Sequence, residues 1–488
     1  MQQLGAQDAQ FLYMESDENL IHVTAVYVYD PSTAPNGEVR FKDIIAHVES
    51  RLDASPIFRR RLIHVPLDLD YPYWADDEHF DIEFHIRHGR LPAPGDWRQF
   101  CIHMARFHSR PLAMRRPPWE MYVVEGLDDV EGMPKGSYAI ATKIHHAAVD
   151  GTSAIKFLGA LHDIDANGTP AIKTDPAEVQ VTERPSLTTM LGRAVFNNVT
   201  SPVRMIETAM RSAPTLYQAV QNTLRPDDDG AGVPDSRFNV PVSAHKMFDA
   251  TVFELADFRR IKEAVDGATV NDAVLAVCGG GLRQYMQHHG ELPDRSLVAW
   301  VPINARLNKE TKSEARQGGN RITAMTSRIF TDIDDPLTRL REIARTTRRS
   351  KEAKSGLSAR LMTDLTQHVP AATQLIAGRL VLRAGMAPKL CNLFISNVPG
   401  PQLALYMNGA QMFHSYAMAP LANGMGLFIA TPSYNGQISF SVTSTREILP
   451  DIELLMECLR DAQQNLLQAA NESIEAPEDP APKKVTLI

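Results

Sequence analysis

One short segment constrains the fold of this chain more than any other, because residues 144–151 have the sequence Ile-His-His-Ala-Ala-Val-Asp-Gly. The segment follows Ser137–Ile144, which has the apolar alternation of a β-strand. It precedes Thr152–Ile164, where apolar residues recur at helical spacing behind a residue that can cap the first turn. The pattern predicts a strand, a sharp turn and a helix, with two histidines and an aspartate on the turn.

Strand-like and helix-like segments alternate along the rest of the chain. Strands are expected where β-branched and aromatic residues cluster, at Leu20–Tyr29, Met121–Gly126, Thr251–Leu255, Leu297–Ile303, Leu393–Asn397, Leu427–Thr431 and Gln437–Thr443. Helices are expected where apolar residues recur every three or four positions, at Phe41–Leu52, Ala256–Ala264, Asn271–Gln287, Pro336–Lys354 and Asp451–Ala470. This alternation predicts an α/β protein, in which helices cover sheets.

Two polar stretches divide the chain into parts. Asp165–Ser186 contains prolines, and Asp227–Ser236 is acidic and rich in turn-forming residues, so both are expected to be surface connections. We therefore predict an N-terminal domain over residues 1–180, a linker region over 181–245 and a C-terminal domain over 246–470. Residues 471–488 are rich in proline and charge, which is typical of a disordered tail.

The composition excludes several classes of protein. The 488 residues include 50 basic and 58 acidic side chains, a net charge of −8, which argues against a nucleic-acid partner. Four cysteines lie far apart without the spacing of zinc ligands, so we expect reduced thiols in a cytoplasmic protein: Cys101, Cys278, Cys391 and Cys458. The N-terminus lacks the pattern of a signal peptide, and no apolar run reaches the roughly 18 residues of a spanning helix. Any membrane contact is expected to be peripheral.

The paired histidines are the candidates for catalysis. A neutral imidazole can accept a proton near neutral pH, so His146 is a candidate general base. Asp150 could orient the ring or pair with an arginine, and Gly151 allows a tight turn because it has no Cβ. Two alternatives remain. A His-xxx-Asp pair could bind a metal, although no third ligand stands at a recognisable spacing, and His145 and His146 could pack in a core without any catalytic role.

Other polar residues are weaker candidates. A covalent mechanism requires an activated serine or cysteine, and the chain has no GxSxG segment, so Ser153 and Ser396 are expected to be bystanders or hydrogen-bond donors. Asn271 is a candidate for a polar role in a site, although the segment Thr269–Asp272 that contains it equally predicts a helix N-cap.

At these residues the chain resembles a known family. HHAAVDG is similar to the active-site motif of the acyl-CoA-dependent acyltransferases, which include chloramphenicol acetyltransferase and the condensation domains of peptide synthetases. Five segments resemble, in order, the blocks of the bacterial wax ester synthase/diacylglycerol acyltransferase family: LGAQDAQFLYMESDENLIHV, RPLAMRRPPWEMYVVEGL, TVNDAVLAVCGGGLRQYM, QGGNRI and NLFISNVPGP. The resemblance covers most of Leu4–Ala470.

The resemblance implies a two-domain chloramphenicol acetyltransferase-like fold, each domain a mixed sheet with flanking helices, and an active-site tunnel at their interface. It implies that His146 is the base, beside His145, and that Asp150 is mainly structural. It also raises Ser396 and Asn397 to candidate substrate contacts, together with Asn271. Without the resemblance, Ser396 and Asn397 are simply the end of a strand before a Pro-Gly turn.

The implied reaction is transfer of a long-chain acyl group from acyl-CoA to a fatty alcohol or diacylglycerol, forming wax ester or triacylglycerol. No metal and no cofactor besides the co-substrate acyl-CoA are expected. The residues suit this chemistry, because an alcohol is hardly ionised at neutral pH and a positioned base contributes about 10²- to 10⁴-fold. The thiolate of coenzyme A leaves more easily, since a free thiol has a pKa of about 8.5. One base can therefore serve a direct transfer without an acyl-enzyme.

One block departs from the family pattern. Where the family commonly has PLDxxxPLW, this chain has Pro111-Leu112-Ala113 followed by Pro117-Pro118-Trp119. The missing aspartate and leucine put a substrate-selecting role of this block in doubt, and Trp119 could simply pack in the core.

Two basic segments suggest contacts with lipids or phosphates. Residues 184–225 contain five arginines and one acidic residue among apolar residues at helical spacing, a pattern typical of helices that lie on a membrane or droplet surface, or of an ordinary surface helix. Residues 339–360 contain eight basic residues and two glutamates, which could attract coenzyme A phosphates or form a solvated helix face. We therefore expect peripheral association with the inner membrane or lipid droplets.

Three other functions are compatible with parts of this pattern. A condensation-type acyltransferase would use a carrier-bound donor in place of acyl-CoA. A lipid-binding protein could keep the fold without catalysis, although the intact HHAAVDG segment weighs against it. A metal-dependent hydrolase is the least favoured.

Overall fold

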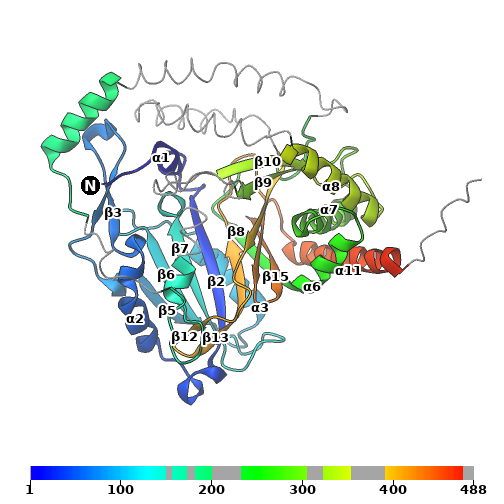
Figure 1. The fold of residues 1–488 in the computed structure, drawn as a ribbon, viewed down its shortest axis with the longest axis horizontal. Coiled ribbons are helices and arrows are strands. Elements are labelled where there is room, and N and C mark those ends of the chain that lie inside the picture. Colours follow the sequence, from blue (N-terminus) through cyan, green and yellow to red (C-terminus); the bar gives the residue numbers. More distant parts are fainter. Residues whose placement is uncertain are drawn as a thin grey trace, which may run out of the picture.

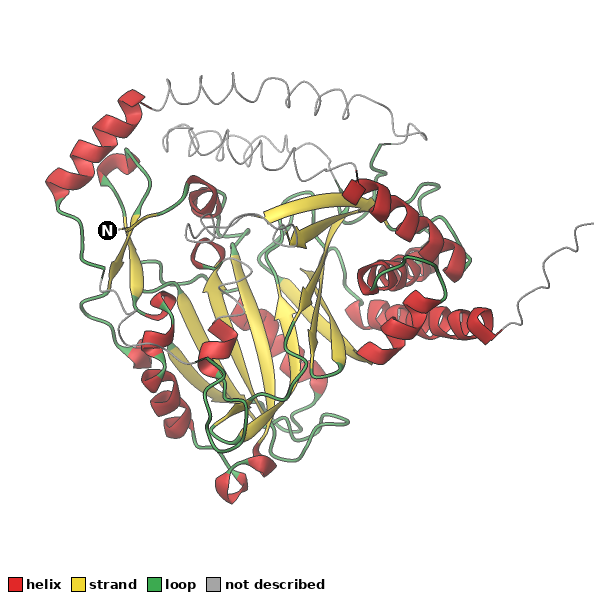
Figure 2. Ribbon diagram, in the orientation of Figure 1, coloured by secondary structure: helices red, strands yellow, loops and turns green. Residues whose placement is uncertain are grey.

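The computed structural model describes residues 2–149, 157–172, 182–200, 232–304, 322–352 and 391–475. Their strands form two six-stranded sheets with helices packed against them, and a three-stranded sheet at one side (Figures 1 and 2). The three-stranded sheet has the order β1 (Gln2–Gln3), β4 (Tyr73–Asp76), β3 (Arg60–Ile63). Both large sheets are mixed, which confirms the predicted fold class.

The first large sheet carries the two histidines of the HHAAVDG segment. In spatial order its strands are β12 (Tyr406–Met407), β13 (Ala410–Met418), β2 (His22–Asp30), β7 (Tyr138–His145), β6 (Trp119–Glu125) and β5 (Ile86–Arg90). Helix α2 (Phe41–Ser50) covers one face and packs Ile44 and Val48 against it, whereas α3 (Trp97–His108) covers the other face through Phe100 and Met104. Trp119 is 2% exposed in the core, as the sequence suggested.

The second large sheet is built from the later part of the chain. Its strands lie in the order β10 (Ile322–Arg328), β9 (Val298–Asn304), β11 (Leu393–Pro399), β14 (Phe428–Tyr434), β15 (Gln437–Thr445) and β8 (Lys246–Glu254). Four helices gather beside it at the right of Figure 1: α6 (Leu255–Glu263), α7 (Val270–His288), α8 (Pro336–Glu352) and α11 (Ile452–Glu475). Together they enclose the largest apolar core of the described residues.

One strand crosses from the later part of the chain into the first sheet. Strand β13 pairs antiparallel with β2, from Gln411 opposite Asp30 to Met418 opposite Thr24, and has a bulge between Met412 and His414. The sequence predicted no strand here. The domain limits at 1–180, 181–245 and 246–470 remain a prediction. They did not anticipate that β13, from the later part of the chain, would pair with β2 in the first sheet.

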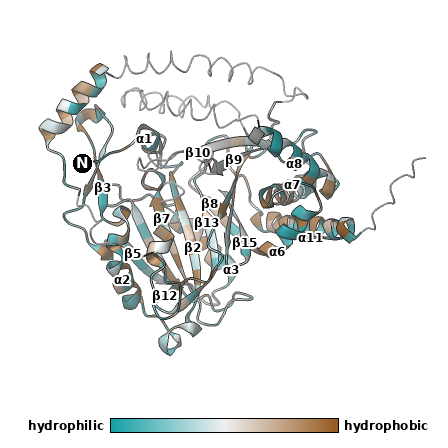
Figure 3. Cartoon of the chain, viewed as in Figure 1, coloured by the Kyte–Doolittle hydropathy of each residue, from teal (hydrophilic) through white to brown (hydrophobic). Residues whose placement is uncertain are grey.

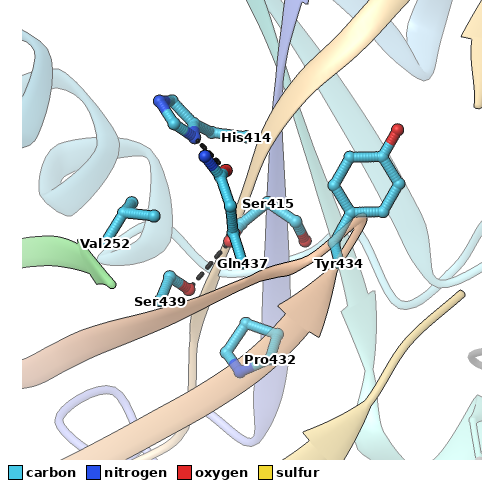
Figure 4. Close-up of a pocket in the computed structure, with 7 residues that line it drawn as sticks. All are labelled: Val252, His414, Ser415, Pro432, Tyr434, Gln437 and Ser439. Atoms are coloured by element: carbon cyan, nitrogen blue, oxygen red, sulfur yellow. Dashed lines mark hydrogen bonds between the residues drawn. The ribbon is translucent and has the colours of Figure 1, made fainter. Parts of the chain in front are cut away.

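Beyond the two residues that pair with β12, side chains of the second sheet contact the edge of β13 that faces away from β2. Ser439 Oγ donates to the carbonyl of Ser415 at 2.8 Å, and Ser441 Oγ accepts from the amide of Ala417 at 3.2 Å. The hydroxyl of Tyr434 donates to the carbonyl of Met412 at 3.0 Å. A small pocket opens along this contact, lined by Val252, His414, Ser415, Pro432, Tyr434, Gln437 and Ser439 (Figure 4).

The two basic segments are partly described. The helix at 187–200 packs Met190 and Ala194 against the three-stranded sheet. In α8, which is mostly hydrophilic in Figure 3, the guanidinium of Arg339 is buried and donates to the carbonyls of Ile333 and Asp334, so it is not available to a phosphate. Within the described ranges, no helix is long and apolar enough to cross a membrane.

Candidate active site

The two histidines lie where β7 ends. His145 is the last residue of the strand, and His146 begins a one-turn 3₁₀ helix, η7 (His146–Ala148). The amide of His146 donates to the carbonyl of Ile21 at 2.9 Å, which ties the turn to the segment before β2. The predicted strand and turn are confirmed. Residues 157–161 of the predicted helix are helical, whereas its first residues, with Asp150 and Gly151, lie outside the described part of the chain.

The ring of His146 packs against helix α1 (Ala6–Tyr13). Its centroid lies 4.2 Å from that of Phe11, with the planes tilted by 31°. Burial, with a smaller contribution from the neighbouring His145, lowers the pKa of His146 to about 4. The residue as a whole is half-buried, whereas His145 is fully buried. His146 is therefore a neutral imidazole at neutral pH, the form that can take a proton from an alcohol.

His145 has a different environment. It is fully buried, its Nδ1 accepts from the amide of Ala147 at 3.1 Å, and its Nε2 lies 3.5 Å from Oε2 of Glu15. Because Nδ1 accepts, the proton of the neutral ring is on Nε2 and faces Glu15. The other carboxylate oxygen of Glu15 accepts from the amide of Ile21 at 3.2 Å. These contacts hold the turn in place. Of the two histidines, His146 is the less buried.

The other predicted site residues belong to the second sheet and its helices. Asn271 is half-buried in the first turn of α7. The N-cap that the sequence predicted there is confirmed, because Thr269 and Asp272 exchange side-chain and backbone hydrogen bonds. Ser396 and Asn397 lie on β11, paired with Ala430 and Thr431 of β14. Their roles as substrate contacts stay predictions.

Sequence reasoning missed the residues that surround the histidines. Phe11 and Glu15 lie in the block 4–23, far from the histidines in the sequence. No local pattern links them to the turn, because only the folded chain brings them there. Among the described residues, no group of three or more His, Cys, Asp or Glu side chains is arranged to hold a metal ion.

Two mixed sheets, the first completed by a strand from the later part of the chain, carry a histidine on the turn that ends a central strand, which is the arrangement that the resemblance to the acyl-CoA-dependent acyltransferases implied. The sequence model of the wax ester synthase/diacylglycerol acyltransferase catalytic domain matches residues 4–274, and that of the family's C-terminal domain matches residues 318–466. The chain therefore belongs to the wax ester synthase/diacylglycerol acyltransferase family and is an acyltransferase. The resemblance seen in the five blocks is confirmed.

Similar proteins agree with this assignment. A relative from Mycobacterium tuberculosis (strain CDC 1551 / Oshkosh), which bears a diacylglycerol O-acyltransferase name, is 31% identical over 97% of this chain and 92% of its own length. The wax ester synthase/diacylglycerol acyltransferase from Marinobacter aquaeolei VT8 superposes with a TM-score of 0.67 at 26% identity, covering 96% of this chain and 100% of that one. The starter condensation domain of rhizomide synthetase has a TM-score of 0.53 at 12% identity, with 97% and 95% coverage, and shows the fold alone.

Proposed function

We propose that this acyltransferase moves a long-chain acyl group from acyl-CoA to the hydroxyl of a fatty alcohol or diacylglycerol, forming wax esters or triacylglycerols. The family's catalytic model covers the histidine turn, and the Mycobacterium and Marinobacter relatives bear names of this activity. The observation that carries the proposal is the neutral, half-buried His146 on the turn after β7.

In the proposed mechanism His146 is the general base. Its imidazole takes the proton of the acceptor hydroxyl as the oxygen attacks the thioester carbonyl, which gives a tetrahedral intermediate. The C–S bond then breaks, the ester is released, and the imidazolium returns the proton to the coenzyme A thiolate. The burial that lowers the pKa of His146 also favours this return, because it disfavours the charged ring. No acyl-enzyme and no metal are needed for these steps.

The substitution His146→Ala tests the base. We expect kcat with acyl-CoA and hexadecanol to fall about 10²- to 10⁴-fold, because proton transfer from the alcohol loses its acceptor. Thiol release, measured with a thiol-reactive dye, and ester formation should fall together. The matched control is His79→Ala, which removes an exposed imidazole and should leave both rates unchanged. Full activity of the His146→Ala protein would show that another group is the base.

The same assay separates the other candidate functions. A condensation-type enzyme would require an acyl-carrier protein as donor and would be inactive with free acyl-CoA. A non-catalytic lipid-binding protein would bind lipid without releasing thiol. Comparing hexadecanol with diacylglycerol as acceptor would establish which of the two esters is the main product.

For localisation, we propose peripheral association of a cytoplasmic enzyme with a lipid surface through the helix at 187–200. Besides its packed residues, this helix exposes large apolar side chains, with exposed fractions of 55% for Leu187, 64% for Val195 and 70% for Val199. Leu67 is 90% exposed in the loop between β3 and β4, the two strands on which the helix packs. A helix with apolar residues on its outer side suits the interface of a membrane or droplet.

A flotation assay tests this surface. The wild-type protein should float with phospholipid vesicles in a density gradient, and the variant Val195→Ser/Val199→Ser should remain at the bottom, because about 0.8 kcal/mol is lost for each methylene no longer buried in lipid. The control Val240→Ser changes an exposed valine elsewhere and should float as the wild type does. Equal flotation of all three proteins would refute the assignment of this helix.

A further inference from the structure

The face of the first sheet that packs on α3 changes from apolar to polar near the histidine turn. Along most of this face the residues are apolar and form one core with α3 and β8. At the end next to the turn they are polar and buried. His22 stands opposite His145, and Lys143 stands between Thr24 and Glu120 on the neighbouring strands. We call His22, Thr24, Glu120 and Lys143, together with His108 of α3, the polar layer.

Lys143 is the centre of the polar layer. Its side chain is fully buried, and its ammonium group donates to the carbonyls of Phe107 at 3.0 Å and Arg110 at 2.9 Å. It lies 3.3 Å from Oε2 of Glu120 and 4.3 Å from the ring centroid of Phe107. The C-terminal end of a helix carries the negative end of its dipole, so the ammonium group of Lys143 lies where a cation is favoured, beside the last turn of α3 and the residue Arg110 that follows it.

The histidines of the polar layer extend this contact to the second part of the chain. His22 Nε2 lies 2.7 Å from the carbonyl of His108, and His108 Nε2 lies 3.3 Å from the carbonyl of Ala419, just after β13. Since carbonyls only accept, both Nε2 atoms carry protons, and Nδ1 of a neutral His108 accepts from the hydroxyl of Thr24 at 2.8 Å. The end of α3 is therefore bonded to β2, to β7 and to the residue that follows β13.

We propose that Lys143 is a positioning residue for the acyl transfer reaction: its bonds to the carbonyls of Phe107 and Arg110 fix β7 three residues before the base, His146. An apolar side chain would continue the apolar face formed by Ala139 and Ala141, and burying a cation is costly unless it is paired. A lysine at this place instead gives β7 a single position relative to α3. His145 and His146 then leave the strand in a fixed direction.

The charge of Lys143 makes the proposal testable by pH. Burial lowers the pKa of this lysine to about 8, and Glu120 opposes the shift. The charged groups that face it are Glu120 on β6, Arg110 after α3, and Arg87 on β5, which is paired with Glu120. His22 and His108 also face it but are neutral, because burial lowers the pKa of both. Above about pH 8 the ammonium loses its proton and its bonds to the carbonyls weaken, so kcat should fall.

The experiment measures kcat and KM with palmitoyl-CoA and hexadecanol from about pH 6.5 to 9.5, a range that spans the titration of this lysine. For Lys143→Met we expect kcat at pH 7 to fall about 10- to 100-fold, because the histidines are displaced, with both KM values within about twofold of wild type. Lys143→Arg keeps a charged donor at every pH, so it should recover most of the activity and lose the decline above pH 8.

Two matched controls accompany these variants. Lys246 is a second buried lysine whose pKa is lowered to about 8, and it donates to the carbonyls of Glu18 and Ser243. The Lys246→Arg protein should keep the alkaline decline, and Lys135→Met, an exposed charge removal, should behave as the wild type. The proposal is overturned if folded Lys143→Met has wild-type kcat, if the wild type shows no alkaline decline, or if Lys143→Arg keeps the decline. Should Lys143→Met not fold, the pH profile of Lys143→Arg decides.

Discussion

At the residue scale, burial determines the chemistry of the imidazoles. It lowers the pKa of His146 and of His162 to about 4 and that of His108 to about 3, so all three are neutral at pH 7. The motif predicted the turn and the candidate base, because strand, turn and helix patterns are local. It could not predict Phe11 and Glu15 as neighbours, since these lie some 130 residues upstream and only the folded chain brings them to the turn.

The lowered pKa of His146 predicts an unusual acid profile. A base with an ordinary pKa of about 6.5 would lose about thirtyfold in kcat/KM between pH 8 and 5, because only the neutral ring accepts a proton. With a pKa of about 4 the ring stays neutral over this range, so we expect kcat/KM to remain within about threefold. Initial rates with acyl-CoA and hexadecanol check this. A midpoint near 6.5 would mean that the free enzyme does not bury the ring as described.

At the element scale, long segments with a regular pattern were predicted within a few residues, and irregular or short ones were missed. Helix α7 was expected over 271–287 and spans Val270–His288. Strand β13 was not predicted, because its bulge shifts the alternation of inward and outward side chains between Met412 and His414. It also pairs with a strand nearly 400 residues away, so no local pattern indicates its partner. The eight-residue helix α1 was also missed, although it carries Phe11.

The three consecutive glycines of α7 give a prediction at this scale. A Cβ on Gly279 would lie 2.1 Å from the carbonyl oxygen of Ile329, so Gly279→Ala must push α7 away from that backbone. We expect the free energy of unfolding to fall by about 1–3 kcal/mol, the usual cost of overpacking. Urea unfolding followed by circular dichroism measures it.

The control for this prediction is Gly192, in the helix at 187–200, where a Cβ would meet nothing within 4 Å. Alanine has the higher helix propensity, so Gly192→Ala should raise the free energy of unfolding by about 0.5–1 kcal/mol. If both substitutions destabilise the protein equally, close packing is not the reason for the glycines of α7.

At the scale of the whole molecule, the buried histidines link folding to pH. His108 and His162 are 2% and 0% exposed, and His162 bonds to the hydroxyl of Tyr29 at 2.7 Å. In an unfolded chain each would have a pKa of about 6.5. Between that value and the lowered value in the folded protein, the unfolded chain binds more protons, so stability is lost as the pH falls through 6.5.

We expect the free energy of unfolding to decrease by about 2 kcal/mol for each of these histidines between pH 8 and 5. Urea titrations at the two pH values measure the decrease. In His162→Gln, which keeps a polar side chain but cannot titrate, the decrease should be about 2 kcal/mol smaller. The exposed control His79→Gln should show the wild-type decrease. An unchanged decrease in His162→Gln would contradict the coupling.

The crossover strand also bears on how the protein is made. When residues 2–149 have left the ribosome, β2 has its partner β7 on one side, but the strand for its other edge, residues 410–418, is not yet translated. Until that strand is made, the nascent chain presents an unprotected edge, the kind of surface on which chains aggregate. The first sheet can be completed only after some 270 further residues have been added, so its maturation waits for a strand from the other half of the structure.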